Sequence, residues 1–209
     1  MDRLHVGKNL IPYLLALLLV CGSNAVAAGP TETVESTVNQ VIKILTDPRY
    51  AGETNREERR RLLRETISPR FDFQEMAKRS LGTEWIRRTP EEQKEFVKIF
   101  TEFVEQTSVH NIDSYDKQKF LYTGEKTSER DAVVEGKIVT RDGDEIKIDY
   151  LLNRTKDEWK VYDLVVNGIS FDDNYRAQFA RVIRQSSYEG LVQRLKEKLA
   201  DKAVAVAPR

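Results

Sequence analysis

The spacing of apolar residues changes twice along this chain, and this change constrains the fold more than any other feature of the sequence. Between residues 32 and 110 apolar residues recur at helical spacing, whereas between 117 and 166 they alternate with polar residues. From 172 to 200 the helical spacing returns. Helices, then antiparallel strands, then two more helices make an α+β arrangement, in which a helical layer must cover the apolar face of the sheet.

The first helical segment carries one apolar stripe. Its members recur at i, i+4, i+7, i+8 and i+11, so the spacing predicts a helix over 32–45. Asp47-Pro48 ends this helix, because the residue before a proline disfavours the helical conformation. The stripe consists of Val34, Val38, Val41, Ile42 and Leu45.

Three more helices are expected before the sheet. Asn55 is a suitable N-cap for a helix that Ser68-Pro69 ends. A short amphipathic helix over 71–81 then ends at Gly82. The sequence Thr89-Pro90-Glu91-Glu92 combines an N-cap, a proline at the first helical position and a glutamate at the third, which predicts the start of a long helix.

The alternating region predicts four antiparallel strands. The third strand is the clearest, because Ile146, Ile148, Tyr150 and Leu152 alternate with polar residues. The fourth strand is expected over 159–166. The predicted connections are a type I′ hairpin turn at Asp142-Gly143, a turn at Lys156-Asp157, the end of the sheet at Gly168, and a helix cap at Asp172 or Asp173.

The first 28 residues have the pattern of a secretory signal peptide. Arg3 and Lys8 precede the apolar run 11–20, which is shorter than the roughly 20 residues that a membrane-spanning helix needs. Ala25-Val26-Ala27 satisfies the small-x-small rule, so we expect cleavage near Ala27 or Ala28. The exported domain is then expected over 29–202, followed by a disordered tail over 203–209.

Removal of this segment leaves few residues that could do covalent or metal chemistry. Residues 1–27 hold the one cysteine, Cys21, and one of the two histidines, so only His110 remains. Of the 34 basic and 34 acidic residues, 32 and 33 remain, a net charge of −1. These counts exclude cysteine nucleophiles and thiolate metal sites, and the charge balance argues against nucleic-acid binding.

Two residues remain as candidates for catalysis. His110 lies near the end of the predicted long helix, where the helix C-terminus favours a positively charged side chain, and we expect such a capping role. Asp163 lies within the apolar strand, where a carboxylate on the buried face could act as a general base with a raised pKa. The simpler interpretation, which we favour, places a partly exposed Asp163 on the outer face or pairs it with an arginine.

Aromatic residues occupy many of the predicted apolar positions. They could form an ordinary core, or the helices and the sheet could stand apart so that these residues line an apolar cavity. Spacing alone does not distinguish a filled core from a hollow one.

Three long strings carry a resemblance to a known family. They are FDFQEMAKRSLGTEW (71–85), TPEEQKEFVKIFTEFVEQT (89–107) and VYDLVVNGISFDDNYRAQFARVIR (161–184). Their order and spacing resemble the MlaC family of periplasmic phospholipid-transport proteins, also called toluene-tolerance proteins. The resemblance covers about residues 30–198.

The resemblance implies a curved cystatin/NTF2-like sheet of four antiparallel strands, a helical subdomain over it, and an apolar cavity between the layers. It implies a non-enzymatic phospholipid carrier without metal or cofactor. Its implied partners are an outer-membrane lipoprotein/porin complex and an inner-membrane ABC transporter with an MCE-domain subunit. Such a carrier would maintain the lipid asymmetry of the outer membrane from the periplasm.

The apolar positions within the matching strings are the expected lipid-binding residues. They are Phe71, Phe73, Met76, Ala77, Leu81, Phe96, Ile99, Phe100, Phe103, Val104, Ile146, Ile148, Tyr150, Leu152, Val166, Ile169, Phe171, Tyr175 and Phe179. Five arginines near helix ends or turns are expected mostly at the solvated surface, where one or two could meet a phosphate or an acidic partner. These are Arg79, Arg87, Arg88, Arg154 and Arg176.

Two other classes of function remain open. An NTF2-like enzyme would use Asp163 as a base on a small apolar substrate, and would need that carboxylate inside the pocket. An exported chaperone or scaffold would expose an apolar groove instead of enclosing a cavity.

Overall fold

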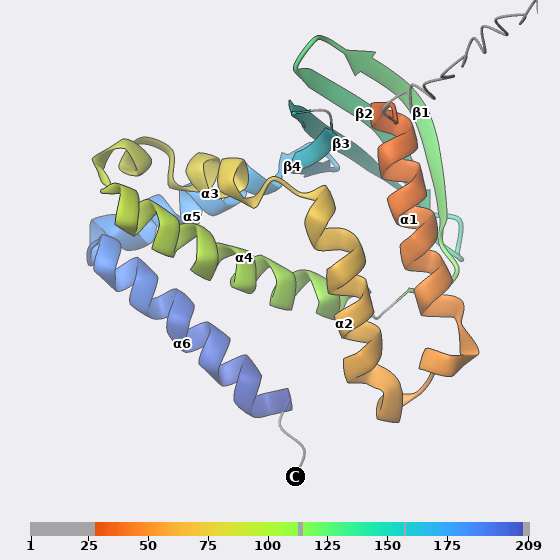
Figure 1. Ribbon diagram of the computed structural model, residues 1–209, viewed down its shortest axis with the longest axis horizontal. Coiled ribbons are helices and arrows are strands. Elements are labelled where there is room, and N and C mark those ends of the chain that lie inside the picture. Colours follow the sequence, from red (N-terminus) through yellow and green to blue (C-terminus); the bar gives the residue numbers. More distant parts are fainter. Residues whose placement is uncertain (1–27, 113–114, 157, 207–209) are drawn as a thin grey trace, which may run out of the picture.

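A computed structural model describes residues 28–112, 115–156 and 158–206, and it shows an antiparallel sheet with helices packed beside it (Figure 1). This confirms the predicted α+β class. The helices are α1 (Pro30–Thr46), α2 (Arg56–Ile67), α3 (Phe73–Leu81), α4 (Pro90–Ile112), α5 (Phe171–Gln185) and α6 (Tyr188–Val206). Short 3-10 turns are η1 (Pro48–Tyr50), η2 (Glu53–Asn55), η3 (Ser68–Arg70) and η4 (Gly82–Arg87).

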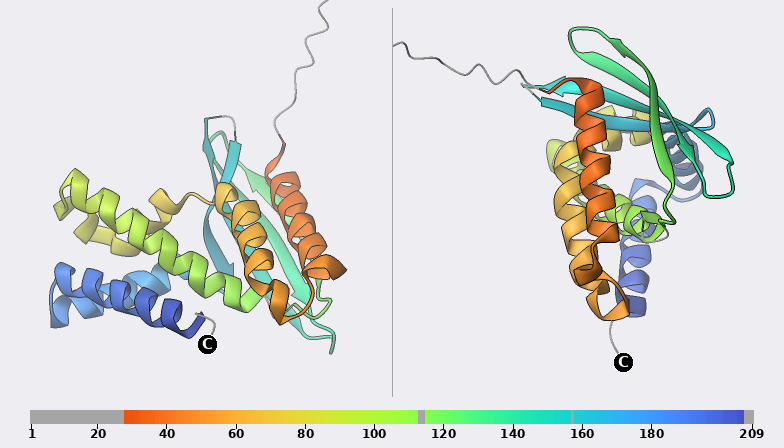
Figure 2. Two further views of the ribbon diagram at one scale, coloured as in Figure 1. Left: turned by 60° about the horizontal axis from the view of Figure 1, so that its bottom comes forward. Right: turned by 90° about the vertical axis from the view of Figure 1, so that its right-hand side faces the viewer.

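The sheet is a meander in the order β1-β2-β3-β4-β5, each strand antiparallel to the next. Its strands are β1 (Lys119–Thr127), β2 (Asp131–Val139), β3 (Glu145–Thr155), β4 (Glu158–Val166) and β5 (Ile169–Ser170). Register shifts at Tyr122/Gly124 and Leu151/Leu152 interrupt the pairing, and such bulges bend and twist a sheet (Figure 2). The two-residue strand β5 is an addition to the four predicted strands.

Two tight turns differ from the sequence-based expectation. Gly143 has a φ of 92°, but Asp142 does not have a positive φ, so this hairpin does not close with a type I′ turn. Instead Gly143 N–H donates to the Thr140 carbonyl oxygen, as in a type I turn followed by a left-handed glycine. Asn167 and Gly168, with φ of 49° and 80°, have the signs of a type I′ turn, and this turn produces β5.

Side-chain caps begin several of the helices. The Thr89 hydroxyl accepts from the N–H of Glu92, whose carboxylate accepts from the N–H of Thr89, so the predicted capping box at the start of α4 is confirmed. The cap of α5 is Ser170, not Asp172 or Asp173 as predicted, because the Ser170 hydroxyl accepts from the N–H of Asp173.

Two hydrophobic clusters stabilise the molecule. The helical cluster consists of buried residues of α3, α4, α5 and α6, which lie together to one side of the sheet (Figure 2). The sheet cluster joins β2, β3 and β4 to Val34 of α1. Phe71 packs against both clusters, so it connects them.

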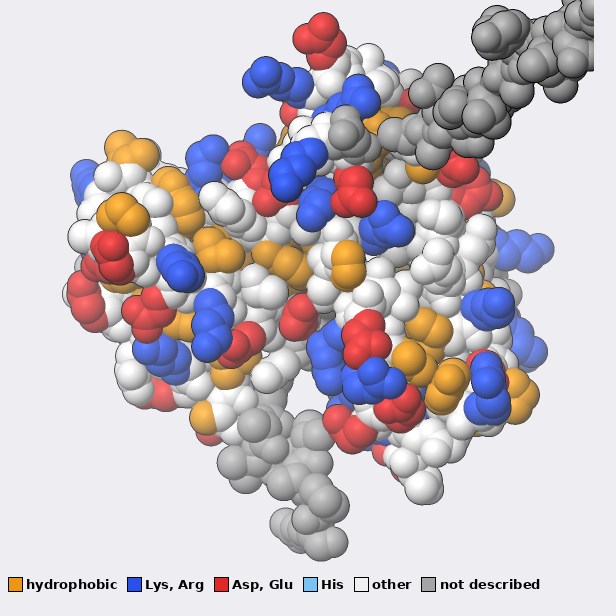
Figure 3. All heavy atoms as spheres, viewed as in Figure 1, with side chains coloured by type: hydrophobic (Ala, Val, Ile, Leu, Met, Phe, Trp, Pro, Cys, Tyr) orange, Lys and Arg blue, Asp and Glu red, His pale blue; other side chains and the backbone are white. Residues whose placement is uncertain are grey.

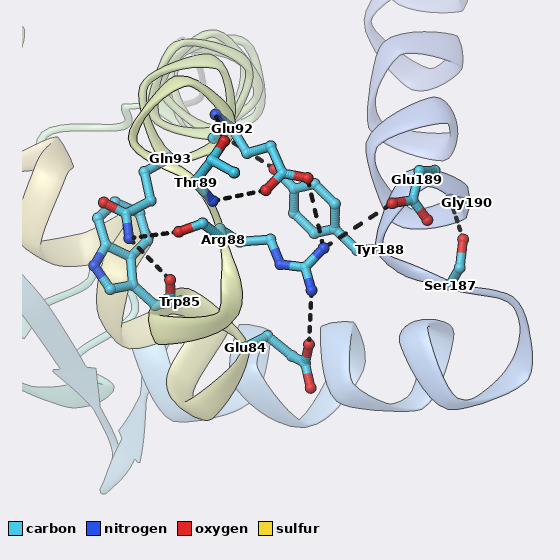
Figure 4. A network of polar contacts seen from close by, with 10 residues as sticks. All are labelled: Glu84, Trp85, Arg88, Thr89, Glu92, Gln93, Ser187, Tyr188, Glu189 and Gly190. Atoms are coloured by element: carbon cyan, nitrogen blue, oxygen red, sulfur yellow. Dashed lines mark hydrogen bonds and ion pairs between the residues drawn. The ribbon is translucent and has the colours of Figure 1, made fainter.

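A polar network fastens the start of α4 to α6 (Figure 4). The Arg88 guanidinium lies 3.7 Å from carboxylate oxygens of Glu84 and Glu92, and its central carbon lies 4.5 Å from the centre of the Tyr188 ring. The Tyr188 hydroxyl donates to the Glu92 carbonyl oxygen at 3.2 Å. The network therefore holds α6 by hydrogen bonding and cation–π contact in addition to apolar packing.

Candidate functional site

A cavity of about 400 Å³ lies between α1, the end of α2 and one face of the sheet. This volume is within the range of small-molecule pockets. Most of its wall is aliphatic or aromatic, with four uncharged polar residues and a single charged residue, Arg70. The lining residues are Thr33, Val34, Thr37, Val38, Val41, Ile42, Leu45, Ile67, Arg70, Phe71, Tyr115, Gln118, Phe120, Ile138, Thr140, Ile146, Tyr150 and Val161.

Helix α1 forms one long wall of the cavity. Its predicted apolar stripe faces the sheet, and all five members of the stripe line the cavity. Val34 is 4% exposed, but Val38, Val41, Ile42 and Leu45 are only half-buried. An apolar stripe that faces a sheet without being fully covered indicates unfilled space beneath it.

The opposite wall comes from the regular alternation of the strands. Tyr150 pairs with Val134 and Leu164, and Leu152 pairs with Val161, so these side chains share one face. Tyr150 and Val161 on this face line the cavity. Because side chains in a strand alternate between faces, the polar residues of the same strands point away from it.

Hydrogen bonds attach the start of α1 and the segment next to Phe71 to the sheet. At the start of α1, the backbone N–H and the hydroxyl of Thr31 both donate to the Glu125 carboxylate of β1. Next to Phe71, the N–H of Asp72 donates to the Val161 carbonyl oxygen at 2.8 Å. Asn153 also donates its side-chain amide to the Asp72 carboxylate at 2.8 Å, so η3 and the start of α3 are tied to the sheet.

Two tyrosines of the sheet are held in their neutral form. Burial raises the pKa of Tyr150, which lines the cavity, well above its usual value. Burial, and to a lesser extent the Glu35 carboxylate, raises the pKa of Tyr122 to about 12. A tyrosine is neutral at pH 7 even with its usual pKa, and the raised pKa values keep both hydroxyls uncharged in alkaline solution as well.

The structure places the expected lipid-binding residues in four different environments. Phe71, Ile146 and Tyr150 line the cavity. Ile148 and Leu152 are buried in the sheet cluster. Val166 and Ile169 are 39% and 66% exposed beside the β4–β5 turn. The remaining twelve belong to the helical cluster or pack against it: Phe73, Met76, Ala77, Leu81, Phe96, Ile99, Phe100, Phe103, Val104, Phe171, Tyr175 and Phe179.

The cavity also includes residues that were not expected there. The apolar stripe of α1 was predicted, but its role as a wall of the cavity was not. The prediction assigned no other apolar surface to cover this stripe. Phe120 and Ile138 lie in the alternating region between residues 117 and 166, and this alternation was the signal that could have located them.

Asp163 lies outside the cavity. It pairs with Leu151, whereas its neighbour Leu164 pairs with the cavity-lining Tyr150, so Asp163 points to the opposite face. It is 5% exposed, and its carboxylate accepts hydrogen bonds from the Ser170 hydroxyl and the backbone N–H groups of Leu164 and Asp172. The enzyme hypothesis required Asp163 inside the pocket, and the expected exposure or arginine pairing of Asp163 is also not found.

The five arginines considered for phosphate contact also lie outside the cavity lining. Four form ion pairs: Arg79 with Glu75, Arg87 with Glu84, Arg88 with Glu84 and Glu92, and Arg176 with Asp173. Arg154 lies beside the Trp159 ring. Charges of both signs are interspersed over the face shown in Figure 3.

Some expectations concern residues whose structure is not described. The His110 side chain, residues 1–27 and the end of the chain from 207 fall in this class. Within the described part of the chain, no group of three or more His, Cys, Asp or Glu residues is placed to hold a metal ion. None of the described helices is long and apolar enough to cross a membrane.

Comparison with known proteins gives three consistent similarities. The sequence model of the MlaC protein family matches residues 35–197. The toluene tolerance protein ttg2D of Pseudomonas putida is 25% identical over 176 residues, which cover 83% of this chain and 82% of that protein. A phospholipid-binding protein from Ralstonia solanacearum, solved in complex with a phospholipid, has a TM-score of 0.73 at 29% identity, covering 84% of this chain and 99% of that one.

Proposed function

This chain belongs to the MlaC family, and from that premise we propose that it is a phospholipid carrier whose cavity beneath α1 holds acyl chain. The observation that carries this proposal is the apolar cavity of about 400 Å³ between α1 and the sheet. The relative from Ralstonia solanacearum, which is similar over 84% of this chain, binds a phospholipid and supports the same conclusion.

The physical need for such a cavity follows from the cost of moving a lipid through water. Each methylene removed from an apolar environment costs about 0.8 kcal/mol, so an acyl chain crosses an aqueous space only if it is shielded. A wall formed by the α1 stripe and the sheet supplies that shield. The proposal needs no bond to form or break, so it assigns no catalytic residue, metal or cofactor beyond the lipid cargo.

The cellular role extends this proposal. The carrier would work in the periplasm after removal of the segment that ends at Ala27 or Ala28. It would move phospholipid between an outer-membrane lipoprotein/porin complex and an inner-membrane ABC transporter with an MCE-domain subunit, and so maintain outer-membrane lipid asymmetry. The signal-peptide pattern and the family membership support this role.

Lipid extraction tests the binding proposal directly. Protein purified from cells is extracted with organic solvent, and phospholipid is quantified by mass spectrometry against protein concentration. We expect close to one phospholipid or more per chain. Folded protein that repeatedly contains no lipid, and that does not take up phospholipid from vesicles, would contradict the proposal.

A pair of variants on α1 tests where the lipid lies. Ile42→Glu places a charge in the cavity wall, whereas Gln40→Glu adds the same charge on the exposed face of the same helix. We expect Ile42→Glu to lose most of its bound lipid and Gln40→Glu to retain it, because burying an unpaired carboxylate against an acyl chain is unfavourable. Equal lipid content in both variants would place the lipid elsewhere.

A further inference from the structure

Arg70 is the one charged residue among those that line the cavity. It lies at the end of η3, beside the cavity-lining Phe71. Within the described residues, the Arg70 guanidinium has no ion pair, hydrogen bond or aromatic ring contact. This differs from Arg79, Arg87, Arg88 and Arg176, each of which already has a carboxylate partner.

The backbone around Arg70 is held firmly in place. The N–H of Phe71 donates to the Ser68 carbonyl oxygen at 3.2 Å, and Phe71 forms a parallel bridge with Val161 of β4. The next N–H, that of Asp72, also donates to β4. The backbone at Arg70 is therefore fixed relative to the sheet that forms the opposite wall of the cavity.

Arg70 is half-buried beside an apolar wall, and no carboxylate of the described residues neutralises its charge. The aliphatic stem of an arginine can lie along apolar surface while its guanidinium reaches more polar surroundings. The guanidinium presents N–H donors in a planar fork that matches the two oxygens of a phosphate. An anionic group that an acyl chain anchors in the cavity would supply this counter-ion.

We propose that Arg70 binds the phosphate group of the lipid cargo by bidentate, charge-assisted hydrogen bonds. This inference rests on the proposed function, and it makes Arg70 the residue that selects phosphate-bearing lipids over neutral ones. Because every glycerophospholipid has this phosphate, Arg70 discriminates between lipid classes with and without phosphate, and not between different headgroup substituents.

A competition between two lipids with identical acyl chains tests the selection. Delipidated protein is equilibrated with equal amounts of phosphatidylglycerol and the corresponding diacylglycerol, and the bound ratio is measured by mass spectrometry. We expect the wild-type protein to favour phosphatidylglycerol and Arg70→Gln to reduce that preference about tenfold, mainly through weaker phosphatidylglycerol binding. Arg87→Gln, which removes an exposed arginine of η4, is the matched control and should bind like wild type.

The outcomes separate this inference from the proposed function. If the wild-type protein takes up neither lipid, the proposed function fails. If it takes up lipid but Arg70→Gln keeps the wild-type ratio, or loses both lipids equally, Arg70 does not bind phosphate and this inference fails. Arg70→Lys keeps the charge without the planar fork, so its preference for phosphatidylglycerol should lie between those of wild type and Arg70→Gln. It replaces the glutamine variant in this test if that variant does not fold.

A final arm identifies the source of the phosphate. Inorganic phosphate at millimolar concentration should leave phosphatidylglycerol binding unchanged, because it lacks the acyl chain that holds the lipid in the cavity. If inorganic phosphate displaces the lipid from wild-type protein and not from Arg70→Gln, the site is one for a free anion and the inference is overturned.

Discussion

Among single residues, Asp172 is in the least favourable environment for a charge. It is 3% exposed, and neither carboxylate oxygen has a hydrogen-bond partner within the part of the chain that the structure describes. Burial first, and then the nearby Asp163 carboxylate, raise the pKa of Asp172 from its usual value to about 8. The native state is therefore more stable when Asp172 is protonated and uncharged.

This pKa predicts a pH-dependent stability. Between about pH 4 and pH 8 the native state holds a proton on Asp172 that the unfolded state has released, so the free energy of unfolding falls as pH rises through this window. Asp172→Asn removes this titration, so between pH 5 and pH 8 the free energy of unfolding of the variant should fall by about 3 kcal/mol less than that of the wild type. Urea denaturation at the two pH values measures this difference.

Asp173→Asn is the control for that experiment. Asp173 is the next residue, is exposed, and forms an ion pair with Arg176, so its removal should change stability little at either pH. If Asp172→Asn and wild type show the same change between pH 5 and pH 8, Asp172 is not a neutral acid in the native protein.

At the scale of elements, the two hydrophobic clusters are expected to respond differently to truncation. Phe100 of α4 is fully buried, with the rings of Phe96, Tyr175 and Phe179 centred 5.9 to 6.2 Å away. We expect Phe100→Ala to lower the free energy of unfolding by about 3–5 kcal/mol. Ile42→Ala, in the half-buried α1 stripe, should lower it by much less but should weaken lipid binding more.

Chemical denaturation and lipid quantification on the same two variants provide the comparison. If Phe100→Ala loses lipid while its stability is unchanged, the acyl chain reaches into the helical cluster, as the residue pattern alone had suggested.

The attachment of α1 to the sheet gives another element-scale prediction. Hydrogen bonds from Thr31 hold the pKa of Glu125 below its usual value, and Glu125→Ala removes both of these bonds. We expect the amides near the start of α1 to exchange with solvent about tenfold faster, while the amides of β3 keep their wild-type rates. Hydrogen-exchange mass spectrometry on lipid-free protein measures this effect, and equal rates at α1 in both proteins would show that apolar packing alone holds the helix.

The sequence predicted elements better than it predicted the site. The stripe of α1, the capping box at Thr89 and the alternation of β3 depend on local spacing, and local spacing is what a sequence displays. The location of the cavity depends on which apolar faces meet without filling the space between them. Phe100 and Ile42 occupy similar positions in their helical stripes, yet one is fully buried and the other lines the cavity.

Two wrong predictions, one of a turn type and one of a helix cap, were both based on local residue type. Asp142-Gly143 and Asn167-Gly168 are both strong two-residue turn signals, but only the second forms the type I′ turn. Asp172 was a reasonable helix cap by residue type, but Ser170 takes that position and Asp172 is buried instead. In each case residue type alone did not distinguish between two candidates of similar propensity.

At the scale of the whole molecule, bound lipid is expected to act as part of the core. A ligand that binds only the native state stabilises it by mass action, by about 2.7 kcal/mol at one hundred times its dissociation constant. Delipidated protein should therefore melt at a lower temperature than the same protein reloaded with phospholipid. Differential scanning calorimetry measures the shift, and a melting temperature that does not depend on added lipid would contradict it.

The separation of the two clusters has a consequence for how this protein can change over evolution. Most of the large aromatic side chains lie in the helical cluster, away from the cavity wall formed by α1. Substitutions at the half-buried members of the α1 stripe, Val38, Val41, Ile42 and Leu45, can therefore alter the width of the cavity with little risk to folding. Relatives that handle longer, shorter or branched acyl chains could arise by a few such substitutions, and the same helix is the natural place to engineer a carrier for a different lipid.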